Sequence, residues 1–310
     1  MMSLKWTWLF SSPLLCLMAT IPPASAQDAP ITTLKVETRL VAVSAIVRDK
    51  AGQPVTGLTR DNFILKQDGK PQPIRYFSQG SDLPLTLALM VDTSGSQRNY
   101  IQDEIAAGRV FFRTMMKKPE DRAVLVQFDT NILQLAKITS SVTTLEHALS
   151  YLSQSHADYG AGHGGTLLYD AICAVSHIEL SNQMGRRAMV ILTDGDDNGS
   201  QFSEKKAIEE AQRANIVIYS VYYSNGGGDK DVLNDLSKAT GGRVFTVSPT
   251  MTLEQIYAEI AGDMRLLYEI GYDPPPSSPN KYHKIDLKAA LKQNDKALTV
   301  QAREGYFTPK

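Results

Sequence analysis

The stretch LALMVDTSGSQ, residues 87–97, ends an apolar run with three oxygen-bearing side chains at alternate positions. The run suits a buried strand and stops at Asp92, and Ser94 and Ser96 follow at a spacing of two residues. Carboxylate and hydroxyl oxygens are ligands for hard cations such as Mg²⁺, Ca²⁺ or Mn²⁺, and no Cys or His is required. The first hypothesis is therefore a cation site at the end of a strand.

Two further segments offer oxygen ligands. Asp194, in VILTDGDDN, follows an apolar run that begins near Ala188, and Thr166, in YGAGHGGTLLYDAI, stands directly before a helical segment. In a doubly wound sheet, ligands bind outside the carboxyl ends of the strands, near the point where strand order reverses. We therefore expect one edge of the sheet to hold a cation with five residues: Asp92, Ser94, Ser96, Thr166 and Asp194.

Each segment also has an ordinary structural explanation. Ser94 or Ser96 is a suitable cap for a helix that starts nearby, and Thr166 is a suitable cap for a later one. Asp194 and Gly195 form a common turn signal. The joint occurrence of these residues at strand ends favours a metal site over a set of unrelated caps and turns.

Residues 83–262 have the pattern of an α/β domain. The apolar runs PLTLALMV, AVLVQF, AMVIL and IVIYSVYY are separated by amphipathic helical segments. Near-continuous apolar strands that alternate with helices indicate a mostly parallel sheet covered on both faces, that is, a doubly wound α/β fold. Helices are expected to start near Gln97, Thr143, Leu167, Glu204, Lys230 and Leu253.

A β unit precedes this domain and another follows it. In residues 27–80, a strand pattern over 34–47 is followed by a hairpin pattern that turns at Asp68 and Gly69. Residues 266–310 contain two stretches of alternating apolar residues. Because each unit is too small to bury much core alone, we expect the two to pair into one β-sandwich with the α/β domain inserted. Two independent β modules are the alternative.

Residues 1–26 form a predicted secretory signal. Lys5 gives a positive start, LFSSPLLCLMA is an apolar core too short to span a bilayer, and Ala24-Ser25-Ala26 is a small-residue cleavage site. Cleavage removes one lysine and no acid, so the formal net charge changes from −1 to −2. This charge argues against nucleic acid or an anionic membrane as the main partner. We expect an exported protein, periplasmic or secreted, with no membrane span after cleavage; an uncleaved anchor is the alternative.

The five candidate residues resemble a known motif. Asp92-x-Ser94-x-Ser96, followed by Thr166 and Asp194, is similar to the metal-ion-dependent adhesion site of von Willebrand factor A domains, with all five positions filled. The flanks VRDKAGQPVTGLTRDNF and REGYF resemble those of an exported bacterial family of VWFA-related proteins. The resemblance implies that the two serines bind the cation directly and that the two aspartates act mostly through bound water. Thr166 would bind directly or through water, depending on the state of its loop.

The function that this resemblance implies is metal-dependent protein binding of the adhesion type, without catalysis by the protein itself. Neutral hydroxyl ligands leave much of the charge of a dication uncompensated, and Mg²⁺ usually keeps open or water-filled positions. An Asp or Glu of a partner protein is therefore the expected external ligand. Mg²⁺ is the expected cation, with Mn²⁺ or Ca²⁺ as alternatives.

Three other functions have weaker support. An α/β-hydrolase-like enzyme would use Ser94 as its nucleophile, with HGG at His163 as an oxyanion loop, but the turn DTSGS lacks the Gly-x-Ser-x-Gly pattern. A dinucleotide-binding enzyme would need Gly-x-Gly-x-x-Gly after the first strand, where Asp92 would instead repel a pyrophosphate. The third alternative is an envelope scaffold whose metal site does not function, and metal titration separates it from an adhesion module.

Overall fold

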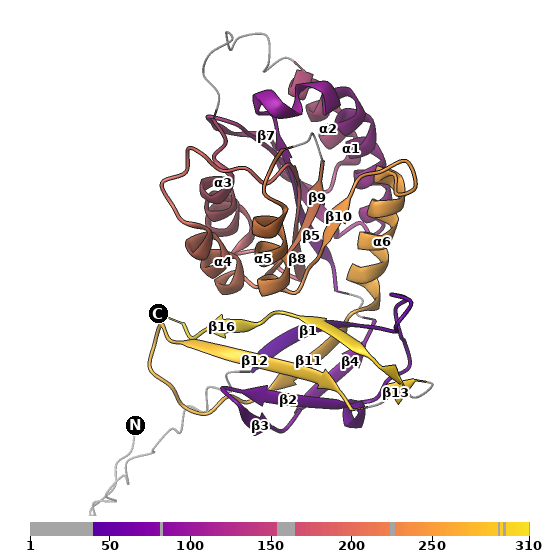
Figure 1. Ribbon diagram of the computed structural model, residues 1–310, viewed down its shortest axis with the longest axis vertical. Helices are drawn as coiled ribbons and strands as arrows, with labels where there is room; N and C mark the ends of the chain where they lie inside the picture. The colour runs from indigo at the N-terminus through magenta and orange to yellow at the C-terminus, as the bar shows by residue number, and fades with distance from the viewer. Residues whose placement is uncertain are drawn as a thin grey trace, which may run out of the picture. The chain divides into compact units, whose positions relative to one another are not determined.

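The computed structural model describes residues 40–80, 83–153, 165–223, 227–290, 292–293 and 296–309 of the 310-residue chain. The predicted signal sequence, residues 1–26, lies outside the described residues. The chain from residue 39 onwards forms one compact unit, whose strands and helices are labelled in Figure 1. Among the helices that the structure describes, none combines the length and the apolar character needed to cross a membrane.

The central sheet has six strands in the order β10-β9-β8-β5-β6-β7. All neighbours are parallel except β6 and β7, which are antiparallel. From β5 the chain passes to β6 on one side, and later from β8 to β9 and β10 on the other, so the strand order reverses between β5 and β8. The predicted doubly wound, mostly parallel sheet is confirmed. The strands are β5 (Leu85–Asp92), β6 (Arg122–Phe128), β7 (Ile132–Thr139), β8 (Arg186–Thr193), β9 (Ile216–Tyr222) and β10 (Val244–Thr246).

The apolar sequence of β5 follows from burial on both faces of the sheet. All eight of its residues are buried. Leu87, Leu89 and Val91 belong to one hydrophobic cluster, whereas Ala88 and Met90 belong to a second cluster on the opposite face. A strand covered on both sides needs apolar residues at every position, and this explains why the run is continuous rather than alternating.

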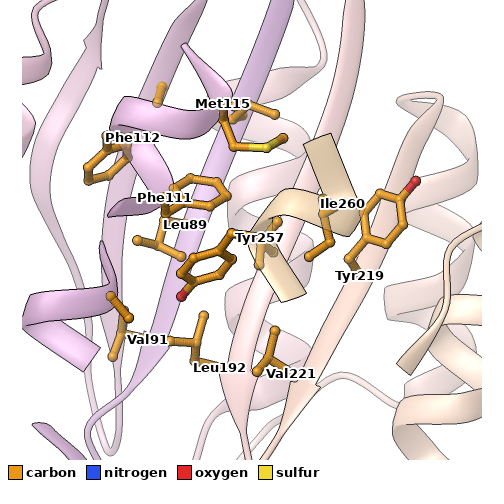
Figure 2. Packing of buried hydrophobic residues seen from close by; sticks show 14 of the residues in the cluster. Leu89, Val91, Phe111, Phe112, Met115, Leu192, Tyr219, Val221, Tyr257 and Ile260 are labelled. Atoms are coloured by element: carbon orange, nitrogen blue, oxygen red, sulfur yellow. The ribbon is translucent and has the colours of Figure 1, made fainter. Parts of the chain in front are cut away.

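Helices cover the sheet on both faces. Figure 2 shows aromatic and aliphatic side chains of α1 and α6 packed against β5, β8 and β9, with Phe111 and Tyr257 in T-shaped contact at 5.1 Å. The opposite cluster includes residues of α3, α4 and α5. The helices are α1 (Ile101–Met115), α2 (Val142–Ala148), α3 (Leu168–Ala174), α4 (Glu204–Arg213), α5 (Lys230–Thr240) and α6 (Leu253–Leu266), with shorter turns η1 (Arg60–Asn62), η2 (Gly95–Tyr100), η3 (Leu149–Ser153) and η4 (Val175–Leu180).

Local capping explains where several helices begin. Ser203, Asp229 and Thr252 precede α4, α5 and α6, and each accepts a hydrogen bond from an amide in the first turn. The predicted start near Gln97 is wrong by four residues, because the chain first forms the 3₁₀ turn η2 and α1 begins only at Ile101. The remaining five starts lie within one residue of prediction.

Strands from both sides of the α/β segment share two antiparallel sheets, with the orders β15-β1-β11-β4 and β16-β12-β2-β3. Strand β1 pairs with β11 and β15, and β2 pairs with β12 and, through the turn at Asp68 and Gly69, with β3. The two sheets enclose a third hydrophobic cluster that includes Val43, Phe63 and Tyr268. The strands are β1 (Val41–Arg48), β2 (Phe63–Gln67), β3 (Lys70–Gln72), β4 (Tyr76–Gln79), β11 (Tyr268–Tyr272), β12 (Tyr282–Ala289), β15 (Thr299–Ala302) and β16 (Gly305–Phe307), and a separate pair is β13 (Lys292–Gln293) with β14 (Lys296–Ala297).

Buried ion pairs join the sandwich to the α/β layers. Asp263 of α6 pairs with Arg48 of β1 and, at 3.2 Å, with Arg243, which directly precedes β10. Arg186 of β8 donates to Glu269 of β11 at 2.8 Å. Because these partners come from both parts of the fold, the α/β segment and the sandwich are held together by charge as well as by the chain connections.

Candidate metal centre

The two predicted aspartate ligands lie at the point where the strand order of the central sheet reverses. Asp92 is the last residue of β5 and Asp194 directly follows β8. These strands are parallel neighbours, with Val91 opposite Leu192. The loops that follow them therefore leave the sheet side by side, at the position where doubly wound folds bind their ligands.

Asp92 is completely buried, and each of its carboxylate oxygens accepts one hydrogen bond. Its Oδ1 accepts the amide of Ser94 at 2.9 Å, and its Oδ2 accepts the hydroxyl of Thr193 at 2.6 Å. Burial raises the pKa of Asp92 to about 6, although the hydrogen bonds from Thr193 and Ser94 act in the opposite direction, and the charge of Asp194 adds to the rise. The two carboxylates are therefore close enough to repel each other, and a cation between them would relieve that repulsion.

The two serines place their hydroxyls together. Ser94 Oγ and Ser96 Oγ are 3.1 Å apart, with Ser94 buried and Ser96 exposed. Ser94 precedes the 3₁₀ turn η2, but its side chain accepts no capping hydrogen bond. Helix capping therefore does not account for Ser94, and its hydroxyl faces that of Ser96 instead.

Gln97 also belongs to this site, although no sequence pattern predicts it. Its Nε2 donates to Asp194 Oδ2 at 2.8 Å, and its backbone amide donates to the carbonyl of Ser94 at 3.0 Å. The side chain is fully buried, and its Oε1 has no hydrogen-bond partner among the described residues. Gln97 thus connects the serine turn to the carboxylate that follows β8.

Thr166 is tied to both of the other loops. Its amide donates to Asn198 Oδ1 at 2.8 Å, and the amide of Asn198 donates back to the Thr166 carbonyl at 3.3 Å. On the other side, Leu167 donates to the carbonyl of Asp129 at 2.9 Å, and the carboxylate of Asp129 accepts the hydroxyl of Thr93 at 3.0 Å. The N-cap of α3 is Leu167, so Thr166 does not serve as that cap. Hydrogen bonds thereby connect four segments, namely the loops after β5, β6 and β8 and the residues before α3.

Two glycines allow the loop after β8 to approach the loop before α5. Gly195 and Gly228 have φ angles of 89° and 93°. A Cβ on Gly195 would lie 2.3 Å from the Asp229 carbonyl oxygen, and a Cβ on Gly228 would lie 2.3 Å from that of Asp194. Any side chain at either position would therefore displace the backbone that carries Asp194.

The donor set fits a hard dication. Asp92 and Asp194 are both buried, and within the described part of the chain neither forms an ion pair with a lysine, arginine or histidine. Hydroxyl and carboxylate oxygens are the donors that Mg²⁺ and Mn²⁺ prefer. The described residues contain no group of three or more His, Cys, Asp or Glu that would hold a metal. The candidate set has only two carboxylates, and its other members are hydroxyls.

The surroundings of Ser94 offer little to a hydrolase. The hydroxyl of Ser94 bonds to that of Ser96, and no described histidine is hydrogen-bonded to it. His163, which the hydrolase alternative would use, lies outside the described residues.

The family follows from comparison with known proteins. The sequence model of the von Willebrand factor type A domain matches residues 86–259, which is more than half of the chain. The chain belongs to this family, whose domains typically mediate protein–protein interaction. No curated protein matches the chain.

Two solved structures share the fold at low sequence identity, and a third is similar with a lower TM-score. A von Willebrand factor type A protein from Catenulispora acidiphila has 12% identity and a TM-score of 0.51, over 80% of this chain and 74% of that one. Proximal thread matrix protein 1 from the mussel byssus has 16% identity and a TM-score of 0.50, over 64% of this chain and 50% of that one. The von Willebrand domain of the type V pili tip protein Mfa5 from Porphyromonas gingivalis has 14% identity and a TM-score of 0.45, over 58% and 94%.

Proposed function

We propose that the protein is an exported, metal-dependent protein-binding module of the adhesion type. The observation that carries this proposal is the meeting of three loops at the strand-order reversal, with two buried carboxylates that have no positively charged partner among the described residues. Mg²⁺ is the cation proposed, with Mn²⁺ or Ca²⁺ as alternatives. Export rests on the predicted signal sequence of residues 1–26, and the location would be periplasmic or extracellular.

Each residue has a proposed role. Ser94 and Ser96 would bind the cation through their hydroxyls, which the structure places 3.1 Å apart. Asp92 and Asp194 would hold bound waters, since each already accepts hydrogen bonds that fix its orientation. Thr166 would bind directly or through water. When bound, a dication supplies positive charge with a coordination position open to an outside carboxylate.

The partner proposed is a protein that presents an Asp or Glu side chain. Hydroxyl ligands on this chain leave the charge of a cation only partly compensated, so an acidic oxygen from outside adds binding energy. We propose that this centre binds without catalysing a reaction. An envelope scaffold with an inactive metal site and a hydrolase that uses Ser94 are the competing outcomes of the experiment below.

The site assignment is tested by calorimetry. Asp194→Ala and Ser94→Ala should abolish Mg²⁺ binding, while both variants still unfold cooperatively in EDTA and so remain folded. Wild-type protein should be stabilised by Mg²⁺ according to occupancy, by about 2.7 kcal/mol when the free ion is 100 times Kd. In pull-downs from an envelope extract, capture should require Mg²⁺ and should be lost in Asp194→Ala.

Asp103→Asn is the matched control, because Asp103 is an exposed acid at the start of α1, outside the site. It should bind Mg²⁺ like the wild type. Equal Mg²⁺ affinity in the wild type, Asp194→Ala and Ser94→Ala would refute the site. A wild type that binds no divalent ion would favour the scaffold, and turnover of esters that is lost in Ser94→Ala would favour the hydrolase.

A further inference from the structure

A serine, a histidine and an aspartate form a hydrogen-bonded line in the β-sandwich. Ser277 lies in the loop between β11 and β12, His283 lies on β12, and Asp68 lies in the turn between β2 and β3. Ser277 Oγ is 2.7 Å from His283 Nε2, and His283 Nδ1 is 2.7 Å from Asp68 Oδ2. The two ring nitrogens thus connect a hydroxyl on one side with a carboxylate on the other.

The register of the sheet fixes Asp68 against the histidine. The amide of Lys284 donates to Asp68 Oδ1 at 2.9 Å, and the amide of Asp68 donates to the Lys284 carbonyl at 3.0 Å. Desolvation alone would raise the pKa of Asp68, but the hydrogen bonds from His283 and from the Lys284 amide outweigh it, so that this pKa lies below its usual value. An ionised Asp68 accepts only, so it selects the proton on Nδ1 and leaves the Nε2 lone pair to accept the hydroxyl of Ser277.

Buried neighbours hold the imidazole in place. His283 is 3% exposed and stacks on Tyr306 at a ring-centroid distance of 5.4 Å. Gln67 Oε1 accepts the hydroxyls of Tyr272 at 2.8 Å and Tyr306 at 3.3 Å, and Gln67 Nε2 lies 3.0 Å from Nδ1. With the proton on Nδ1 both nitrogens are donors, so this approach adds no hydrogen bond to the imidazole. Asp68 is both closer to Nδ1 than Gln67 and charged, and its contact therefore decides the tautomer.

The loop that carries Ser277 is fastened on its C-terminal side. Thr308 Oγ1 donates to the Ser278 carbonyl at 2.8 Å, and the Asn280 amide donates to the Pro309 carbonyl at 3.0 Å. Ser277 itself is half-buried, so its hydroxyl is positioned by the loop without being enclosed.

Ser277, His283 and Asp68 all line one pocket of about 620 Å³. Its lining also includes Pro275, and two exposed lysines, Lys70 and Lys281, that form no ion pair with a described residue. The volume suits a small ligand, and the two ammonium groups favour one with negative charge.

We propose that Ser277 is the nucleophile of an ester-hydrolysing site, with His283 as general base and Asp68 as the residue that positions it. The substrate class is a carboxylic ester that carries a negative charge on its acyl or alcohol part. No residue of the metal centre takes part, so this proposal is independent of the proposed binding function and assigns to the sandwich a reaction that the metal centre does not perform.

The reaction balances with water as the only co-reactant. Ser277 Oγ bonds to the carbonyl carbon as its proton passes to His283 Nε2. The bond from that carbon to the alcohol oxygen breaks, and the alcohol leaves with the proton from Nε2. Water then attacks the acyl-serine with His283 as base, which releases the carboxylic acid and restores Ser277.

The first test is covalent labelling of the full mature chain with an alkyl fluorophosphonate, which traps a nucleophilic serine as fluoride leaves. Mass spectrometry should find the adduct on Ser277, both with Mg²⁺ and with EDTA. Ser277→Ala should carry no adduct. Ser140→Ala is the control, because Ser140 is an exposed serine between β7 and α2 that does not line this pocket, and it should be labelled at Ser277 like the wild type.

The second test is hydrolysis of mono-p-nitrophenyl succinate, an ester that carries a carboxylate. Ser277→Ala and His283→Asn should each lower kcat/KM by about 10²-fold or more. Asp68→Asn should lower kcat/KM and reduce the labelling of Ser277, whereas Asp68→Glu, which keeps the carboxylate, should retain more of both. p-Nitrophenyl acetate should have a lower kcat/KM than the charged ester.

Either of two results overturns the proposal. One is a folded wild type that acquires no adduct on Ser277. The other is a rate of ester hydrolysis that is the same in the wild type and in Ser277→Ala. In both cases the hydrogen bonds of His283 would serve only to fix the loop to the sheet.

Discussion

Asp194 receives a hydrogen bond from a neutral amide rather than from a charged residue. Gln97 Nε2 lies 2.8 Å from Asp194 Oδ2, and the amide of Asp196 donates to Oδ1 at 3.2 Å. A neutral donor orients a carboxylate without cancelling its charge. Asp194 is therefore held in position by neutral donors alone.

Replacement of Gln97 by alanine should destabilise the cation-free protein. Gln97→Ala removes one donor to a buried carboxylate, and we expect the free energy of unfolding in EDTA to fall by about 1.5–3 kcal/mol. Urea denaturation measures this difference. Gln102→Ala, at an exposed position of α1, is the control and should change stability by less than about 0.5 kcal/mol. Equal effects of the two substitutions would contradict the role of Gln97.

The sequence marks candidate ligands of the proposed site, but it does not mark the residues that hydrogen-bond to them. Three oxygen-bearing residues at a spacing of two follow the apolar strand, and this pattern marks Asp92, Ser94 and Ser96 in the sequence. No comparable pattern marks Gln97 or Asn198. Gln97 bonds across 97 residues to Asp194, and Asn198 bonds across 32 residues to Thr166. Such contacts depend on which loops become neighbours in the fold, and no local pattern encodes that.

Helix α1 carries an acid on the face that packs against the sheet. Glu104 is completely buried, and neither of its carboxylate oxygens has a hydrogen-bond partner among the described residues. The buried hydroxyls of Tyr223 and Tyr257 also lack such partners. Burial raises the pKa of Glu104 well above its ordinary value of 4.5, and the charges of Asp92 and Asp103 act in the same direction.

The acid on α1 makes stability depend on pH. Below pH 4.5, the ordinary pKa of a glutamate, Glu104 holds its proton in both the folded and the unfolded state. Above that pH the unfolded state loses the proton first, because the pKa of Glu104 is raised in the folded state. The free energy of unfolding therefore falls as pH rises from 4.5 towards the folded-state pKa. Glu104→Gln removes this loss. The variant should gain stability relative to the wild type between about pH 5 and about pH 8, as measured by urea denaturation in EDTA.

The matched control for this helix is Glu120→Gln, at an exposed glutamate before β6. Its stability difference from the wild type should not change over the same pH range. If Glu104→Gln behaved like the control, Glu104 would not hold its proton more tightly in the folded state.

Strands whose residues are nearly all apolar and buried could be predicted from the sequence, whereas an exposed edge strand and a very short strand could not. β5 and β8 were evident because nearly every residue is buried. β7 was missed because only Ala136 of its eight residues is buried, as expected for an antiparallel edge strand. β10 has three residues, too few for any periodicity. The turn η2 includes residues 97–100, which the prediction assigned to the first helix although the apolar spacing begins only at Ile101.

Across the whole molecule, Asp263 joins the two parts of the fold. It is 1% exposed and pairs with Arg48 of the sandwich and with Arg243. Asp263→Ala would leave two arginines without this partner, and we expect a loss of about 3–5 kcal/mol in the free energy of unfolding. Calorimetric melting or urea denaturation measures the loss.

Glu259→Ala tests whether burial is the cause of the large loss of stability expected for Asp263→Ala. Glu259 also pairs with Arg243, at 2.5 Å, but its side chain is 42% exposed. Its removal should cost less than about 1 kcal/mol because solvent screens the pair. Similar losses for Asp263→Ala and Glu259→Ala would show that the buried pair has no special weight.

The order of strands in the sandwich has a consequence for synthesis. β1 to β4 leave the ribosome before the α/β segment, whereas their partners β11, β12, β15 and β16 emerge after it. The early strands lack these pairing partners until the six-stranded sheet, whose strands β5 to β10 are consecutive in the sequence, has been synthesised. Nascent chains of this protein are therefore expected to be most prone to aggregation during that interval, and the sandwich can close only after its C-terminal strands have been made.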